Sequence, residues 1–147
     1  MKKWLSSAAL ILLACTASAA EKPYEVFGKY KVHFSVFNSS FISPEIAQAN
    51  NIVRGKDRAI INIAVVETSA DGDTHGLAAV VKGHAANLMQ QQKKLKFAEI
   101  NEQNAVYYLA STRFTNEEVL NFEISVKPDP NKAPFIVRFT KTLYVDR

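Results

Sequence analysis

The chain has 147 residues, with 18 lysines and arginines, 14 aspartates and glutamates, and a single cysteine. This length suits one domain of common size. Two of the lysines and none of the acids lie in the first twenty residues, so 16 basic and 14 acidic residues remain beyond them. This mild, mixed charge excludes nucleic acid as a partner, because binding to DNA or RNA needs a concentrated basic face.

The amino terminus has the three parts of a secretory signal peptide. Two lysines are followed by an apolar run and then by small residues that precede Glu21. The apolar run, Trp4 to Ala14, is about eleven residues long, whereas a membrane-spanning helix needs roughly 20. We therefore predict that residues 1–20 are removed on export and that residues 21–147 form a single periplasmic domain without a transmembrane span.

Cys15 offers an alternative cleavage. Leu12 to Cys15 resembles the site at which bacterial lipoproteins are cut and acylated, which would tether the protein to a membrane. Leu13 is unusual at its position, and the small residues after Cys15 would then have no purpose, so export without a lipid is favoured. With either cleavage the globular domain lacks a disulfide, and its stability rests on its core.

Apolar and polar residues alternate along most of the remaining chain, which is typical of strands with one buried face. The clearest alternation places Phe122, Ile124 and Val126 on one face and their neighbours on the other. A polar stretch at residues 101–104 predicts a hairpin loop. The predicted strands lie within residues 24–37, 59–66, 77–91, 95–100, 106–114, 120–127 and 135–145.

One helix has clear start and stop signals. Ser43 is a typical N-cap, Pro44 suits the first helical position, and Glu45 lies where the helix dipole favours an acid. Asn50 and Asn51 end the helix after about two turns. The first connection between strands therefore contains a short helix.

About seven short strands without alternating helices indicate an all-β protein. We predict an antiparallel β-sandwich, immunoglobulin-like in the broad sense, with one short helix in the first connection. The cysteine and tryptophan pattern of antibody domains is absent, so a small barrel is the structural alternative.

Several segments carry a family resemblance. They are FNSSFISPE at residues 37–45, NIVRGKDRA at 51–59, INI at 61–63, NL at 87–88, L-x-F-x-E-I at 95–100 and AVYY at 105–108. In these segments the chain resembles the DUF4426 family of exported bacterial proteins, and the resemblance covers essentially the whole predicted domain. The family has no assigned activity, ligand or catalytic residue, so the resemblance implies only an exported domain of the cell envelope.

The first connection, residues 38–58, is the most informative stretch for function. A connection of this length in a compact domain usually covers the core or has a binding role. If it is structural, its apolar residues plug the open end of the sandwich, while Asn38 and Asn62 cap backbone groups. If it is a recognition surface, the candidate partner-binding residues are Asn38, Ser40, Arg54, Lys56 and Arg58.

The histidines support an alternative hypothesis, a periplasmic copper- or zinc-binding protein. The candidate ligands are His33, His84 and Met89. No two histidines have the compact spacing of a His-x-His ligand pair, so ordinary surface histidines are the simpler interpretation.

Two further features are weak. Lys93, Lys94 and Lys96 form a basic run that suits either contact with an anionic lipid or glycan or, as we favour, a solvated strand edge. Ser39 and Ser40 follow His33 closely, but the chain has no Gly-x-Ser-x-Gly elbow. We therefore expect no catalytic residue and no cofactor, and predict a non-enzymatic periplasmic module that binds an envelope protein or a small ligand.

Overall fold

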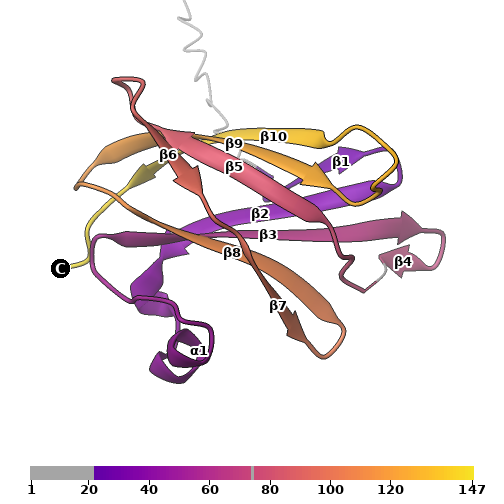
Figure 1. The fold of residues 1–147 in the computed structure, drawn as a ribbon, viewed down its shortest axis with the longest axis horizontal. Helices are drawn as coiled ribbons and strands as arrows, with labels where there is room; N and C mark the ends of the chain where they lie inside the picture. The colour runs from indigo at the N-terminus through magenta and orange to yellow at the C-terminus, as the bar shows by residue number, and fades with distance from the viewer. Residues whose placement is uncertain (1–21, 74) are drawn as a thin grey trace, which may run out of the picture.

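Two antiparallel sheets pack face to face in the computed structural model, which describes residues 22–73 and 75–147 (Figure 1). The six-stranded sheet has the order β1-β2-β3-β8-β7, with β4 paired to β3, and the four-stranded sheet has the order β10-β9-β5-β6. The strands are β1 (Tyr24–Phe27), β2 (Tyr30–Asn38), β3 (Arg58–Ser69), β4 (Gly72–Asp73), β5 (Val80–Ala86), β6 (Gln92–Leu95), β7 (Ala98–Glu102), β8 (Ala105–Arg113), β9 (Glu118–Lys127) and β10 (Phe135–Leu143).

The predicted all-β antiparallel sandwich is confirmed, but the described residues contain ten strands rather than about seven. The predicted strand 24–37 is a hairpin, because Gly28 adopts a φ of +59° between β1 and β2. The predicted strand 95–100 is also divided. The chain leaves the four-stranded sheet after Leu95 and joins the six-stranded sheet at Ala98.

The main core lies between the two sheets. Ile61, Ile63 and Val65 of β3 and the alternating Phe122, Ile124 and Val126 of β9 are buried in it, as the period of two predicts. Aromatic rings join the layers at one side, where Phe34 stacks on Phe139 with ring centroids 4.5 Å apart. These contacts leave the even-numbered residues of β3 and the odd-numbered residues of β9 on the two outer faces.

The predicted helix forms as α1 (Pro44–Ala49), after a 3-10 turn, η1 (Ser39–Phe41). The side chain of Ser43 accepts a hydrogen bond from the backbone N–H of Ile46, as an N-cap does. Asn50 caps the other end, and its side-chain amide donates to the carbonyl of Ile46. The residues that begin and end this helix therefore act through local contacts, and the sequence predicts them.

A second, smaller core lies under this helix. Ile42, Ala47 and Ile60 are buried together, and Phe37, Ile52 and Leu109 pack against them. Ile60 points to the opposite side of β3 from Ile61, so the connection covers the outer face of the six-stranded sheet at the end where β3 begins (Figure 1). The expectation that it plugs the open end of the sandwich is therefore wrong.

The crossing from β4 to β5 passes tightly beside two other strands. The backbone N–H of Gly76 donates to the carbonyl of Asn104 (3.1 Å), and that of Leu77 donates to the carbonyl of Val65 (2.8 Å). A Cβ atom at position 76 would lie 2.4 Å from the backbone nitrogen of Val106. No side chain fits there, so this passage requires glycine.

The predicted signal peptide and Cys15 lie outside the described residues. Within the described ranges, no helix has the length and apolar character needed to cross a bilayer.

Candidate functional site

The connection between β2 and β3 is fastened at its base by Ser39. This side chain is fully buried, and its hydroxyl donates to the carbonyl of Gly55 (3.0 Å) and accepts from the N–H of the same residue (2.9 Å). A buried hydroxyl that satisfies both polar groups of one peptide residue fixes the two ends of the connection against each other.

The predicted partner-binding residues Asn38, Ser40 and Arg54 point into this framework. Asn38 accepts from the N–H of Ser40 (3.0 Å) and donates to the carbonyl of Lys56 (2.9 Å). The Ser40 hydroxyl donates to the carboxylate of Asp146, and the Arg54 guanidinium donates to the carbonyl of Ser40 (3.0 Å). These polar groups hold the backbone of the connection, which is the role that Asn38 has in the structural interpretation.

The two remaining predicted residues differ from each other. The Lys56 side chain is exposed and has no hydrogen-bond or ion-pair partner in the described part of the chain. Arg58 is half-buried at the start of β3, opposite Arg113 of β8. Arg113 pairs with Asp57 (2.6 Å), and this bond holds the pKa of the Asp57 carboxyl below its usual value. Lys56 is thus the one cation among these five residues that is exposed and unpaired.

Three large apolar side chains of the connection face solvent. Phe41 is 77 % exposed, Val53 is 58 % exposed and Ile46 is 46 % exposed. In the structural interpretation of the connection its apolar residues, Ile46 and Val53 among them, would pack on the core, but hydrophobicity in a short segment does not distinguish inward from outward residues. Phe41 follows directly after residues whose hydrogen bonds fix the turn η1, so its side chain is presented from a rigid base.

The predicted metal ligands are not brought together. His33 lies on the outer face of the six-stranded sheet, and His84 lies on the outer face of the four-stranded sheet, so the sandwich separates them. Met89 is in the exposed β5–β6 hairpin. The described residues contain no group of three His, Cys, Asp or Glu side chains arranged to hold a metal ion.

His33 instead packs beside Tyr24, with ring centroids 5.6 Å apart. Burial lowers the pKa of His33, and the nearby Lys31 ammonium lowers it further, while the Asp73 carboxylate opposes them. Lys31 itself is paired with Asp73 at 3.0 Å. This arrangement favours a neutral imidazole in the folded protein.

The outer face of the four-stranded sheet contains a row of polar residues that no sequence pattern identifies as a unit. Lys94, His84, Glu123 and Arg138 are direct neighbours in register on β6, β5, β9 and β10. Glu123 and Arg138 form an ion pair at 3.0 Å. The row crosses every strand of the sheet.

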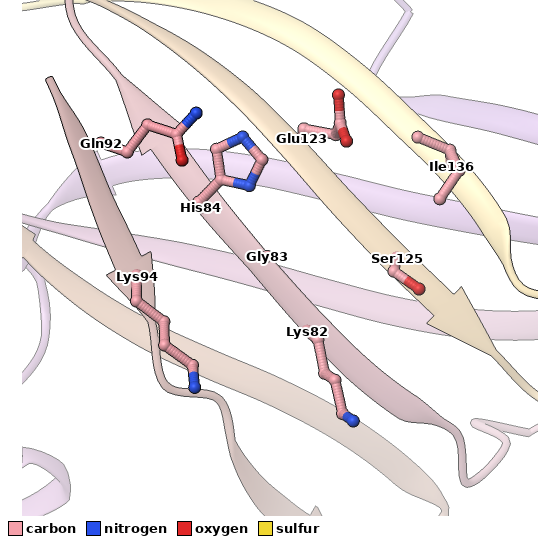
Figure 2. Close-up of a pocket in the computed structure, with 8 residues that line it drawn as sticks. All are labelled: Lys82, Gly83, His84, Gln92, Lys94, Glu123, Ser125 and Ile136. Atoms are coloured by element: carbon pink, nitrogen blue, oxygen red, sulfur yellow. The ribbon is translucent and has the colours of Figure 1, made fainter. Parts of the chain in front are cut away.

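This row borders a cavity of about 540 Å³, which is shown in Figure 2. Lys82 and Lys94 lie at one end of the view, and His84 lies between Gln92 and Glu123 at the other. A second cavity of about 460 Å³ shares His84, Gln92 and Glu123 with the first. We call the two joined cavities the polar trough. The second cavity is lined by His84, Ala86, Asn87, Gln90, Gln92, Asn121, Phe122, Glu123, Arg138, Phe139 and Thr140.

The sequence carried a partial signal for the polar trough. Lys94 belongs to a basic run and His84 is a candidate ligand, but Glu123 and Arg138 are far from them in the chain. Only the pairing register of four strands places these residues side by side.

The comparisons with known proteins concern the whole domain. The DUF4426 family, described as a domain of unknown function, matches residues 24–146. The crystal structure of a DUF4426 family protein from Pseudomonas aeruginosa PAO1 superposes with a TM-score of 0.74 and 31 % identity, over 84 % of this chain and 95 % of that chain.

A more distant likeness concerns the fold alone. FetP from uropathogenic Escherichia coli strain F11, recombinantly expressed in the periplasm of E. coli BL21(DE3), superposes with a TM-score of 0.52 and 9 % identity, over 84 % of this chain and 94 % of that chain. A search of curated proteins finds no match to the chain. The resemblance seen in the sequence is confirmed by the family match and the Pseudomonas structure: the chain belongs to the DUF4426 family.

Proposed function

We propose that the protein is a non-enzymatic binding module of the periplasm that docks another envelope protein through the connection 38–58. The observation that carries the proposal is Phe41, a large aromatic side chain that is 77 % exposed on a turn held by hydrogen bonds. Exposed aromatic anchors on rigid backbone are typical of interface hot spots, because little conformational entropy is lost when they are buried.

The chemistry of the connection supports binding rather than catalysis. The Ser39 hydroxyl is fully buried and bonded to both backbone groups of Gly55, so no substrate reaches it. The Ser40 hydroxyl donates to the carboxylate of Asp146, whose own backbone N–H donates to the carbonyl of Lys56. These serines therefore serve the anchoring of the connection.

The compartment is supported by the signal-peptide pattern of residues 1–20 and by the likeness in fold to FetP, which was expressed in the periplasm. The proposed partner carries an apolar pocket for Phe41 and an acidic group near Lys56, because Lys56 is exposed and has no hydrogen-bond or ion-pair partner among the described residues.

In-cell photocrosslinking tests the proposal. A photoreactive amino acid at position 41 is expected to give one discrete adduct in the envelope fraction, identified by mass spectrometry. The same amino acid at Leu88, an equally apolar exposed position in the β5–β6 hairpin, is the matched control and is expected to give none.

The identified partner is then titrated with purified variants. Phe41→Ser is expected to weaken binding by about 30-fold, because truncation of an interface anchor costs about 2 kcal/mol. Leu88→Ser is expected to leave binding unchanged. Equal adducts from both positions, or unaltered affinity of Phe41→Ser, would overturn the proposal.

A further inference from the structure

We infer that the polar trough binds an acidic saccharide, with a carboxylate at its Lys82 and Lys94 end and sugar hydroxyls at its Asn121 end. This site lies on the opposite face of the sandwich from the connection 38–58, and it goes beyond the proposed function.

The size of the trough suits a small ligand. Its two cavities of about 540 and 460 Å³ share three lining residues, and each lies within the range of roughly 300–1,000 Å³ that is usual for ligand sites. The trough extends along β5 from Lys82 to Ala86, a distance of about 13 Å at the rise of an extended strand. An elongated ligand therefore fits better than a compact one.

The charge of the trough calls for an anion at one end. Among the described residues, the ammonium groups of Lys82 and Lys94 have no carboxylate partner. The one carboxylate of the trough, on Glu123, is paired with Arg138 at 3.0 Å. Two unpaired cations beside a neutralised acid leave a positive site for a carboxylate.

The other end of the trough presents neutral hydrogen-bonding groups. The Thr140 hydroxyl donates to the side-chain oxygen of Asn121 (2.6 Å), which leaves the Asn121 amide nitrogen free to donate into the trough. The exposed side chains of Gln90 and Gln92 add further amide donors and acceptors. Amides of this kind match hydroxyl groups better than they match a second charge.

His84 lies where the two cavities meet. Its ring presents an apolar face with polar edges, which suits the apolar face of a sugar ring beside its hydroxyls. Of the described residues that line the first cavity, Ile136 alone has an aliphatic side chain, so an acyl chain has a single aliphatic contact there. These properties together select an acidic saccharide over a lipid.

Calorimetric titration of the purified protein at low salt tests the inference with three probes. Trigalacturonic acid is expected to bind at one site. Maltotriose, which has hydroxyls and no carboxylate, and inorganic phosphate, which has charge and no sugar, are each expected to bind at least about tenfold more weakly, because each engages one end of the trough.

Variants assign the site. Lys82→Gln combined with Lys94→Gln is expected to weaken trigalacturonate binding about tenfold, and Asn121→Ala is expected to weaken it while leaving phosphate binding unchanged. The matched control combines Lys132→Gln with Lys141→Gln, which removes two exposed lysines outside the trough.

Three results would overturn the inference. They are an absence of trigalacturonate binding, an equal loss in the control variant, and phosphate binding as tight as trigalacturonate binding. Variants at Phe41 do not touch the trough, so failure of this inference is distinguishable from failure of the proposed docking surface.

Discussion

The two outer faces of the sandwich use their polar residues in opposite ways. On the six-stranded sheet, the connection 38–58 lies over a second core, and Asn38, Ser39 and Arg54 direct their polar atoms to its backbone. On the four-stranded sheet, Lys82 and Lys94 face solvent without a partner in the described chain.

This difference shows which groups remain available to bind a partner or ligand after the chain has folded. A hydrogen-bonding group already paired within the fold must lose that bond before it contacts a ligand, whereas an unpaired exposed group exchanges only water. On the covered face, the surface left for recognition is therefore mainly apolar, as at Phe41, with the exposed Lys56 beside it. On the bare face it is polar and charged.

The largest effect on stability is expected from Ile60→Ala, which truncates a side chain on the covered face. Ile60 is the floor of the second core and is almost fully buried, so its truncation is expected to cost about 3 kcal/mol of unfolding free energy. Urea unfolding measures the loss. Ile136→Ala on the bare face is the control and is expected to cost much less, because Ile136 is only half-buried. Equal losses would remove the energetic distinction between the faces.

A smaller effect of opposite sign is expected from Asn62→Val. The side-chain oxygen of Asn62 is buried on the covered side of β3, and it has no hydrogen-bond partner in the described chain. Removing an unsatisfied buried acceptor and adding a β-branched residue in a strand is expected to stabilise the protein by about 1 kcal/mol. Thermal unfolding measures the gain.

The control for this substitution is Asn121→Val on the bare face, which breaks the bond from Thr140. It is expected to bring no gain in stability. A destabilised Asn62→Val protein would show that this amide contributes a bond to the covered face.

The smallest effect is the pH dependence of stability that His33 produces. Its pKa is lowered in the folded protein by burial and by Lys31, so the unfolded chain binds the proton more readily. The contribution of His33 to the free energy of unfolding is therefore complete above the ordinary histidine pKa of about 6.5. It is lost as the pH falls through that value toward the lower pKa of the folded protein.

Urea unfolding at pH 7.5 and pH 5.5 measures this dependence. His33→Gln is expected to flatten the difference between the two conditions. A wild-type protein that becomes more stable at the lower pH, with the excess removed by His33→Gln, would contradict the neutral imidazole.

The sequence predicted what local pattern encodes. Alternation identified the sandwich, and Ser43, Pro44 and Asn50 marked the helix, because caps and strand periodicity act between neighbouring residues. The division of segment 95–100 between two sheets was not predicted, because both halves have strand-like composition and only tertiary packing separates them.

The candidate sites show the same limit. The sequence singled out the connection, but it did not show that Asn38, Ser40 and Arg54 turn toward the fold. It named His84 and Lys94 separately, and it did not join them to Glu123, because register between distant strands is set by the whole core. The partner-binding role of Lys56 and Arg58 stays a prediction.

The glycine crossing between β4 and β5 sets an order of events in folding. Gly76 closes against the carbonyl of Asn104 and the backbone of Val106, which follow it by about thirty residues. A chain that emerges amino-terminus first from a ribosome or a translocation channel cannot lock this passage until the β7–β8 hairpin has also emerged. The contacts of Gly76 therefore form only after the second half of the domain is available. A chain stalled before residue 106 is expected to be cleaved readily by proteases.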